Sequence, residues 1–153
     1  MTSESVVAII LARGGSKGIP KKNVRLFGGS PLVEWCLNAA LKSQKIDSVI
    51  LSSDSEEILD CGRKLNCEIH KRSEEHSQDT TTSEESMLAV IEEHPIAQSA
   101  EVLILVQPTS PFTKPEDFDA ALELFEFGEY DSLVTGVPDH SFSWEIDERR
   151  EKK

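Results

Sequence analysis

The sequence predicts an α/β fold, a doubly wound and mostly parallel sheet with helices on both faces. Two strongly apolar runs, within 6–11 and 101–107, are too short to span a membrane and are typical of strands buried in a parallel sheet. Strand and helix patterns alternate four times in about 130 residues, which predicts right-handed crossovers. The 153 residues suit one domain with one core.

The first half of the chain has the pattern of three strands and two helices. Ser30 is a good N-cap and Pro31 a good first residue for a helix with a wide apolar face. Asp54 and Glu57 are interpreted as a capping pair for the second helix, although the place of Asp54 at a strand end also suits a role near a ligand or metal. The predicted elements are strand 6–11, helix 31–41, strand 48–54, helix 55–65 and strand 67–70.

The second half continues the alternation. Thr82 and Glu85 predict a capping box at the start of a helix, and Pro95 ends that helix. The next strand is uniformly apolar and is therefore expected at the centre of the sheet. Thr113 and Glu116 are predicted to cap the last helix. The predicted elements are helix 83–93, strand 101–107, helix 115–127, strand 133–137 and an edge strand at 141–145.

The loop after the first strand has the chemistry of an anion site. In open α/β sheets the ligand sits beyond the carboxyl ends of the strands, and glycines let a backbone nest approach it closely. The loop fits neither the Walker A pattern nor the dinucleotide Gly-x-Gly-x-x-Gly pattern. The alternative is a solvated turn that happens to be basic. The glycines are Gly14, Gly15 and Gly18, and the cations are Arg13, Lys17, Lys21 and Lys22.

Composition excludes several classes of function. The 16 basic and 28 acidic residues give a net charge of −12, which disfavours duplex nucleic acid and anionic membranes as partners. No run approaches the ~18 apolar residues of a membrane helix, and the N-terminus lacks the basic region of a signal peptide. Three cysteines without a Cys-x-x-Cys pair suit a reducing compartment rather than zinc. We therefore expect an intracellular protein, either cytoplasmic or nuclear.

Three ordered motifs carry a resemblance to a known family. They are Leu-Ala-Arg-Gly-Gly-Ser-Lys-Gly-Ile-Pro-x-Lys-Asn at 11–23, Arg-Ser-x-x-x-Ser-x-Asp-x-x-Thr-Ser at 72–83, and Leu-Val-Gln-Pro-Thr-Ser-Pro at 105–111. Over about 6–145 the chain resembles the acylneuraminate cytidylyltransferases, which activate acidic keto-sugars. The resemblance implies a Rossmann-like nucleotidyltransferase domain over 1–145, corresponding to the N-terminal nucleotide-binding part of the family. The charged tail at 146–153 is expected to be disordered.

The resemblance also implies roles for individual residues. Arg13 and Lys22 are the expected catalytic residues. The expected sugar-binding residues are Gln107, Thr109 and Ser110, which follow a strand on a turn stiffened by two prolines. The expected nucleotide-binding residues are Ala12, Arg13, Gly14, Ser16, Lys22, Asn23, Arg72 and Ser83.

The family reaction joins CTP to the anomeric hydroxyl of a nine-carbon keto-sugar acid such as N-acetylneuraminate and releases pyrophosphate. Mg²⁺ is implied as the cofactor, but the aspartates that bind it in the family, and the arm that completes the partner subunit's site in the homodimer, are not expected within these residues. None of the residues is predicted as a metal ligand. Two alternatives stay open: a truncated, non-catalytic nucleotide-binding module, and a cytidylyltransferase for another keto-sugar acid of the KDO type.

Overall fold

A parallel sheet organises the computed structural model, which describes residues 5–15, 18–73, 80–128 and 130–136. Among these residues, four strands pair in the order β5-β4-β1-β6, and every neighbouring pair is parallel. The strands are β1 (Val6–Leu11), β4 (Ser48–Ser53), β5 (Glu68–Lys71) and β6 (Val102–Val106).

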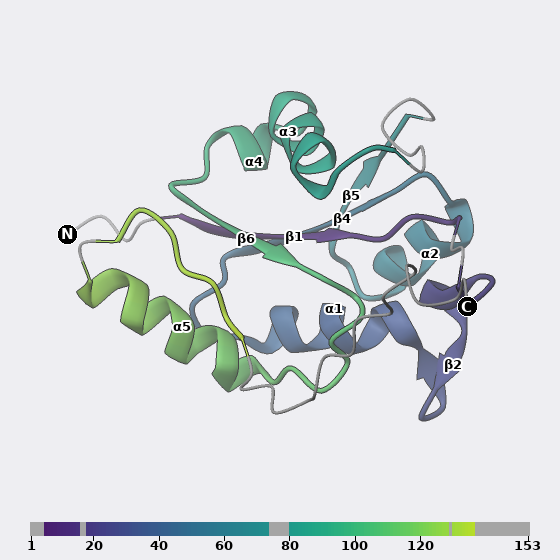
Figure 1. Ribbon diagram of the computed structural model, residues 1–153, viewed down its shortest axis with the longest axis horizontal. Coiled ribbons are helices and arrows are strands. Elements are labelled where there is room, and N and C mark those ends of the chain that lie inside the picture. Colours follow the sequence, from purple (N-terminus) through teal and green to yellow (C-terminus); the bar gives the residue numbers. More distant parts are fainter. Residues whose placement is uncertain (1–4, 16–17, 74–79, 129, 137–153) are drawn as a thin grey trace, which may run out of the picture.

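Helices cover both faces of this sheet, which confirms the predicted doubly wound fold (Figure 1). Two helices lie above the sheet in that view, α3 (Ser83–Glu93) and the short α4 (Pro95–Gln98). Three helices lie below it: α1 (Leu32–Lys42), α2 (Glu56–Lys64) and α5 (Pro115–Phe127). Pro95 stops α3 as predicted and also begins α4, because proline is tolerated at the first position of a helix.

The core follows from the period of two along β1. Ala8 and Ile10 belong to the apolar cluster beneath the sheet, with side chains of α1 and α2. Val7 and Ile9 belong to the cluster above it, with Val90 of α3. All four β1 residues are at most 2% exposed, so β1 is buried on both faces as its unbroken apolar run predicts.

A small hairpin between β1 and α1 was not predicted. A 3-10 turn, η1 (Lys22–Val24), leads into β2 (Leu26–Phe27), which pairs antiparallel with β3 (Ser30–Pro31). Gly28 and Gly29 make the turn at φ 58° and 93°, where a side chain would be strained. The prediction that Ser30 caps α1 is therefore wrong: Ser30 pairs in β3, Pro31 occupies the cap position without a side-chain bond, and the helix begins one residue later than expected.

The other predicted caps have mixed outcomes. Thr82 and Glu85 form the predicted capping box at the start of α3. Asp54 does not cap α2, because its carboxylate accepts a hydrogen bond from a distant loop. At α5 the predicted pair of Thr113 and Glu116 is wrong, because the carboxylate that accepts the first backbone N–H, that of Lys114, belongs to Asp117.

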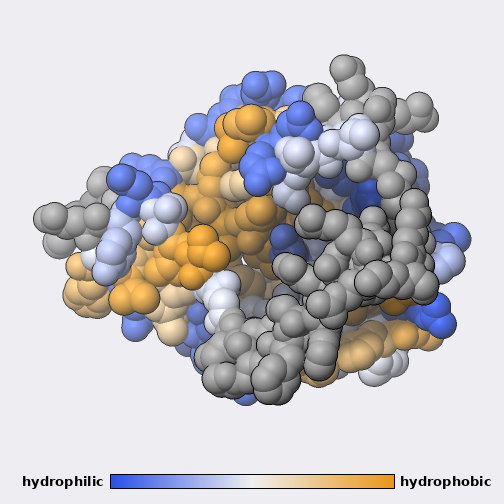
Figure 2. Space-filling view, viewed as in Figure 1, coloured by the Kyte–Doolittle hydropathy of each residue, from blue (hydrophilic) through white to orange (hydrophobic). Residues whose placement is uncertain are grey.

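The place of β6 in the sheet and the segment after α5 differ most from expectation. In the sheet of described residues β6 lies at the end of the strand order rather than at the centre, and Leu105 is 38% exposed. Figure 2 shows apolar side chains gathered on the surface over β6. The predicted strand at 133–137 is wrong as far as it is described, because residues 133–136 pair with no strand of the described chain and Val134 is 92% exposed. The predicted edge strand at 141–145 and the tail lie outside the described residues.

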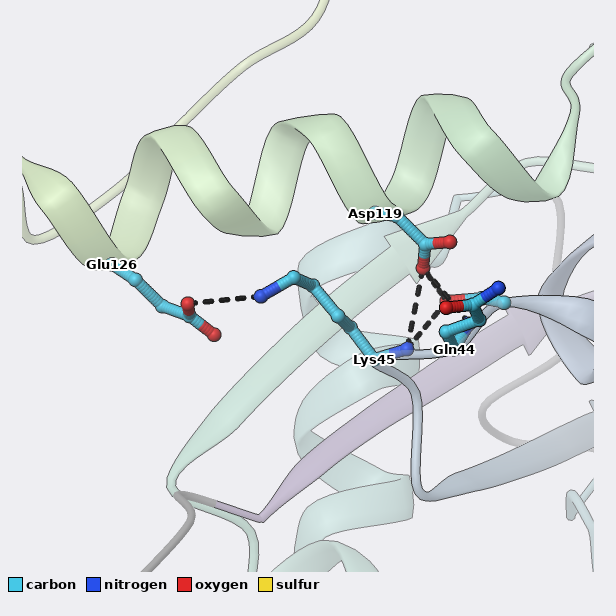
Figure 3. Close-up of polar contacts among 5 residues, drawn as sticks. Gln44, Lys45, Asp119 and Glu126 are labelled. Carbon is cyan, nitrogen blue, oxygen red and sulfur yellow. Dashed lines mark hydrogen bonds and ion pairs between the residues drawn. The ribbon is translucent and has the colours of Figure 1, made fainter. Parts of the chain in front are cut away.

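Polar contacts dock α5 against the connection from α1 to β4 (Figure 3). One oxygen of Asp119 accepts hydrogen bonds from the backbone N–H groups of Gln44, at 3.0 Å, and Lys45, at 3.2 Å. The ammonium of Lys45 lies 3.0 Å from a carboxylate oxygen of Glu126, two turns further along α5. These contacts hold α5 against the connection that leads from α1 into β4.

Candidate functional site

A cavity of about 610 Å³ opens at the carboxyl ends of the strands. Its wall combines segments that are far apart in the sequence, because the carboxyl ends of parallel strands meet at one edge of a sheet. The lining residues are Leu11, Arg13, Gly18, Ile19, Lys22, Asn23, Arg72, Thr81, Thr82, Ser83, Ser86, Leu105, Gln107, Pro108 and Thr109. Seven of the eleven residues predicted for the site therefore line one cavity.

Side chains fix the backbone of the first loop near its start. The Nδ2 of Asn23 donates to the carbonyl oxygen of Arg13 at 2.8 Å, and the N–H of Gly14 donates to Oδ1 of Asp54 at 2.8 Å. These are the two polar groups of a single peptide unit, so its orientation is set from both sides. The N–H of Gly14 is consequently directed at Asp54, and this amide is not part of the anion nest that the glycines suggest.

Three of the predicted site residues that the structure describes, Ala12, Gly14 and Ser110, do not line the cavity. Ala12 is 1% exposed and lies in the apolar core beneath the sheet. Gly14 supports the loop through its backbone. The N–H of Ser110 donates to the carbonyl of Gln107 at 3.2 Å within the turn after β6. Ser16 lies outside the described residues.

The two adjacent lysines of the loop point in different directions. Lys22 lines the cavity. Lys21 adopts a left-handed conformation at φ 52°, and its ammonium lies 2.8 Å from a carboxylate oxygen of Glu57 on α2. Lys21 is thus tied to the protein surface, while Lys17 lies outside the described residues. The cations that the structure places on the cavity wall are Arg13, Lys22 and Arg72.

Arg72 is an unusual buried cation. It directly follows β5, its N–H donates to Ser53 at 2.9 Å, and the residue is only 5% exposed. Its Nε and Nη2 are buried without a hydrogen-bond partner among the described residues. Burial lowers the pKa of the guanidinium, nearby Asp54 acts in the opposite direction, and nearby Arg13 lowers it further. Donors left unpaired in this way have a cost that a bound acceptor would remove.

The start of α3 forms another part of the wall. The capping box at Thr82 places Ser83 as the first helical residue, and both line the cavity. Ser86, one turn later on the same helix face, also lines it and is 4% exposed. Sequence reasoning missed Ser86, although its spacing of three residues from Ser83 is a usable signal. Gln107 and Thr109 complete the opposite wall on the Pro-rich turn.

Two buried residues, Ser52 and His70, lie in series with an exposed glutamate at the end of α3. Ser52 Oγ lies 3.0 Å from Nδ1 of His70, and Nε2 of His70 lies 2.9 Å from Glu93. Ser52 is 0% exposed, so no substrate reaches its hydroxyl, and the series acts as a structural link between the sheet and α3. Histidine thus serves the fold here rather than the cavity.

The described residues contain no group of three or more histidine, cysteine, aspartate or glutamate side chains placed to hold a metal ion. Within the same part of the chain, no helix has the length and apolar character needed to cross a bilayer.

Comparison with known proteins gives a consistent result. The sequence matches the family described as Cytidylyltransferase over residues 7–146. It is 39% identical to N-acylneuraminate cytidylyltransferase A of Danio rerio over 93% of this chain and 32% of that protein. It is 36% identical to N-acylneuraminate cytidylyltransferase of Oncorhynchus mykiss over 92% of this chain and 32% of that protein. The chain therefore spans about a third of the length of the curated relatives it matches.

Solved structures agree on the fold. A CMP:2-keto-3-deoxy-manno-octonic acid synthetase complexed with CTP is similar over 80% of this chain and 48% of that chain, with a TM-score of 0.66 and 19% identity. A cytidylyltransferase from Leptospira borgpetersenii is similar over 82% of this chain and 50% of that chain, with a TM-score of 0.64 and 18% identity. The sequence match and the parallel sheet lead to one assignment: the chain belongs to the cytidylyltransferase family.

Proposed function

We propose that the chain binds CTP in the cavity at the carboxyl edge of the sheet and forms the nucleotide-binding part of an enzyme that activates an acidic keto-sugar. The observation that carries the proposal is Arg72, a buried guanidinium with two unpaired nitrogens in the wall of a 610 Å³ cavity. Arg13 and Lys22 add two further cations to that wall. The names of the relatives in Danio rerio and Oncorhynchus mykiss favour N-acetylneuraminate or a related acid as the sugar.

The wall divides into three parts that suit the parts of the reactants. Arg13, Lys22 and Asn23 would hold the triphosphate, with Ser16 on the same loop. Arg13 offers a planar fork for two phosphate oxygens, and Lys22 offers a point charge. Arg72 and Ser83 would lie on the cytidine side, where the N-terminus of α3 adds a favourable potential for negative charge.

Gln107 and Thr109 would face the sugar. Ser110 stands on the same turn, and its N–H already holds the carbonyl of Gln107, so its proposed contribution is to keep Gln107 in place. Ala12 and Gly14 would act through the backbone of the loop rather than through contact with the nucleotide.

In the proposed reaction the anomeric hydroxyl oxygen of the sugar forms a bond to the α-phosphorus of CTP. The bond from that phosphorus to the bridging oxygen breaks, pyrophosphate leaves with the electron pair, and the hydroxyl proton passes to water. Arg13 and Lys22 would stabilise the charge that develops on the phosphate oxygens, and for that reason we propose them as the catalytic residues.

Mg²⁺ neutralises phosphate oxygens in reactions of this type. Among the described residues no three candidate ligands converge on one point, and Mg²⁺ is usually held by waters and substrate phosphates with only one or two carboxylates. We therefore assign no metal ligand and no catalytic step through the metal to these residues.

The chain spans about a third of its relatives' length. We therefore propose CTP binding for this chain, and sugar transfer and homodimer formation for the whole protein. Release of pyrophosphate from CTP, Mg²⁺ and N-acetylneuraminate would separate an active enzyme from a nucleotide-binding module. Replacing N-acetylneuraminate by a KDO-type acid in the same assay would identify the sugar.

The proposal predicts a specific loss on replacing Lys22 by alanine. A hydrogen bond to a charged group contributes about 1.5–3 kcal/mol, so CTP affinity should fall roughly 10- to 150-fold in calorimetry. Lys21→Ala is the matched control, because Lys21 pairs with Glu57 on the surface, and its effect should stay within about twofold. Equal CTP affinity in the wild type and Lys22→Ala would remove the phosphate site from this loop.

A further inference from the structure

Asp54 lies beside two parts of the proposed site, the first loop and Arg72. Its Oδ1 accepts the N–H of Gly14 at 2.8 Å, from the loop that the proposed function assigns to the triphosphate. Its charge acts on the guanidinium of Arg72, which lines the cavity from the end of β5. The residue itself follows β4 directly and precedes the N-cap of α2, so it is fixed by the strand and the helix at once.

The contact at Gly14 is tight as well as polar. A Cβ built on Gly14 would lie 2.9 Å from Cβ of Ser55, so the loop approaches the β4–α2 junction closely enough that only glycine fits without a shift. Nearby, the N–H of Ala12 donates to the carbonyl of Ser52 at 3.0 Å. The start of the loop is therefore held against the end of β4 by two hydrogen bonds and by close packing.

The Arg13–Gly14 peptide is held by a hydrogen bond at its carbonyl group as well as at its N–H group. Asn23 donates to the carbonyl of Arg13, while Asp54 accepts from the N–H of Gly14. With both polar groups of the peptide engaged, the direction in which the side chain of Arg13 leaves the backbone is set. Arg13 is one of the three cations on the cavity wall, so this geometry bears directly on anion binding.

A carboxylate is an unexpected choice beside an anion site. Its charge lowers the positive potential that attracts a polyphosphate, and by Coulomb's law alone the cavity would bind an anion better without it. A serine or an asparagine could accept the same N–H without that cost. The negative charge of Asp54 also stabilises the buried guanidinium of Arg72, because it raises the pKa of Arg72 against the lowering effect of burial.

We propose that Asp54 is a positioning residue of the nucleotide site, which holds the Arg13–Gly14 peptide so that Arg13 is placed for a polyphosphate before the ligand arrives. This inference rests on the proposed binding of CTP. It assigns to Asp54 no contact with the nucleotide. The cost in potential is offset because the Arg13–Gly14 peptide does not have to be oriented when the ligand binds.

Two substitutions separate the hydrogen bond from the charge. Asp54→Asn keeps an oxygen that can accept the N–H of Gly14 but removes the charge. Asp54→Ala removes both. If Asp54 acts by position, calorimetry should show CTP affinity about fivefold or more weaker in Asp54→Ala, and equal or tighter in Asp54→Asn. If Asp54 acts by charge alone, both variants should bind CTP more tightly than the wild type, and that result would overturn the proposal.

A control and a ligand-free measurement complete the test. Oδ2 of Asp47 accepts the N–H of Val6 at 2.8 Å, a bond of the same kind at the opposite end of β1, so Asp47→Ala should leave CTP affinity unchanged. Hydrogen exchange of the Gly14 amide should be at least about fivefold faster in Asp54→Ala and close to wild type in Asp54→Asn.

The exchange measurement also separates this inference from the proposed function. One possible outcome is faster Gly14 exchange in Asp54→Ala and a wild type that does not bind CTP. It would support the role of Asp54 in holding the Arg13–Gly14 peptide and would refute CTP binding. Unchanged Gly14 exchange, or a wild-type CTP affinity in Asp54→Ala, would refute the role of Asp54 while leaving the CTP site in place.

Discussion

Replacing Arg72 by methionine should raise the stability of the ligand-free protein and at the same time weaken CTP binding. The two effects have one cause. The guanidinium is 5% exposed and its Nε and Nη2 have no hydrogen-bond partner among the described residues, so the free protein carries an uncompensated cost that only a bound acceptor removes. Methionine fills a similar space without polar atoms and tolerates an irregular site.

The size of each effect can be bounded. Each buried donor left unpaired costs about 1–3 kcal/mol, so Nε and Nη2 of Arg72 together cost about 2–6 kcal/mol, of which the charge of Asp54 offsets part. We expect a net gain of about 1–3 kcal/mol in the free energy of unfolding, which for a chain of this size raises Tm by about 2–12 °C. Loss of the charged hydrogen bonds should weaken CTP binding by at least about tenfold.

Thermal unfolding followed by circular dichroism, with and without CTP, tests both effects in one experiment. At a CTP concentration of 100 times the wild-type Kd, bound CTP adds about 2.7 kcal/mol to the stability of the wild type, and at tenfold weaker affinity only about 1.4 kcal/mol to Arg72→Met. The variant should therefore unfold above the wild type without CTP, and CTP should reduce that advantage by about 1.3 kcal/mol or more. A lower Tm of Arg72→Met in the absence of CTP would refute the reasoning, because it would show that the free protein already satisfies the guanidinium.

Two further predictions concern the loop and His94, the half-buried residue that ends α3. Gly14→Ala should destabilise the fold by about 1–3 kcal/mol in urea, because its Cβ would meet Ser55 at 2.9 Å, whereas Gly15→Ala, with nothing within 4 Å, should be nearly neutral; equal effects would contradict the close packing. Burial lowers the pKa of His94, so the unfolded state binds its proton more readily, and stability that is full above about pH 6.5 should fall as the pH drops below that value. His94→Gln should reduce the difference in urea stability between pH 7.5 and pH 5.5, and an unchanged difference would contradict the shift.

The parallel core was predictable because its signal is strong and local. The apolar run of β1 predicted burial on both faces, and its residues 7–10 are at most 2% exposed. Helices α3 and α5 begin and end at the predicted residues, because a capping signal or a proline marks each start. The gathering of Lys22, Arg72 and Gln107 in one cavity followed from topology, since each stands just beyond the carboxyl end of a strand or in the loop after it.

The wrong predictions have a different cause. Each concerned a residue or strand whose sequence suits more than one neighbour, and only the folded structure decides which neighbour it contacts. Asp54 has the composition of a helix cap and also of a backbone acceptor for a distant loop, and only the approach of Gly14 decides between them. Ser30 pairs in a hairpin whose strands have two residues each, too few to give a period of two. The apolar pattern of β6 predicted a central strand, but β6 lies at the end of the described strand order. An apolar pattern indicates that a strand is suited to burial, and it does not identify which element covers the strand.

An acidic protein can bind a polyanion only if its distant negative charges have little effect on the potential at the binding site. The net charge of −12 would oppose CTP if every charge acted at the cavity, but exposed charges are screened over about 8 Å at physiological ionic strength. Lys21 and Lys71 each precede a residue that lines the cavity. Their ammonium groups are paired on the surface with Glu57 and Glu56, respectively. Arg13 and Lys22 are half-buried and Arg72 is buried, where screening is weaker. The potential at the cavity wall should therefore depend mainly on these three cations and on the nearby carboxylate of Asp54. Affinity for CTP should then respond more to these four side chains than to any change in the net charge of the surface.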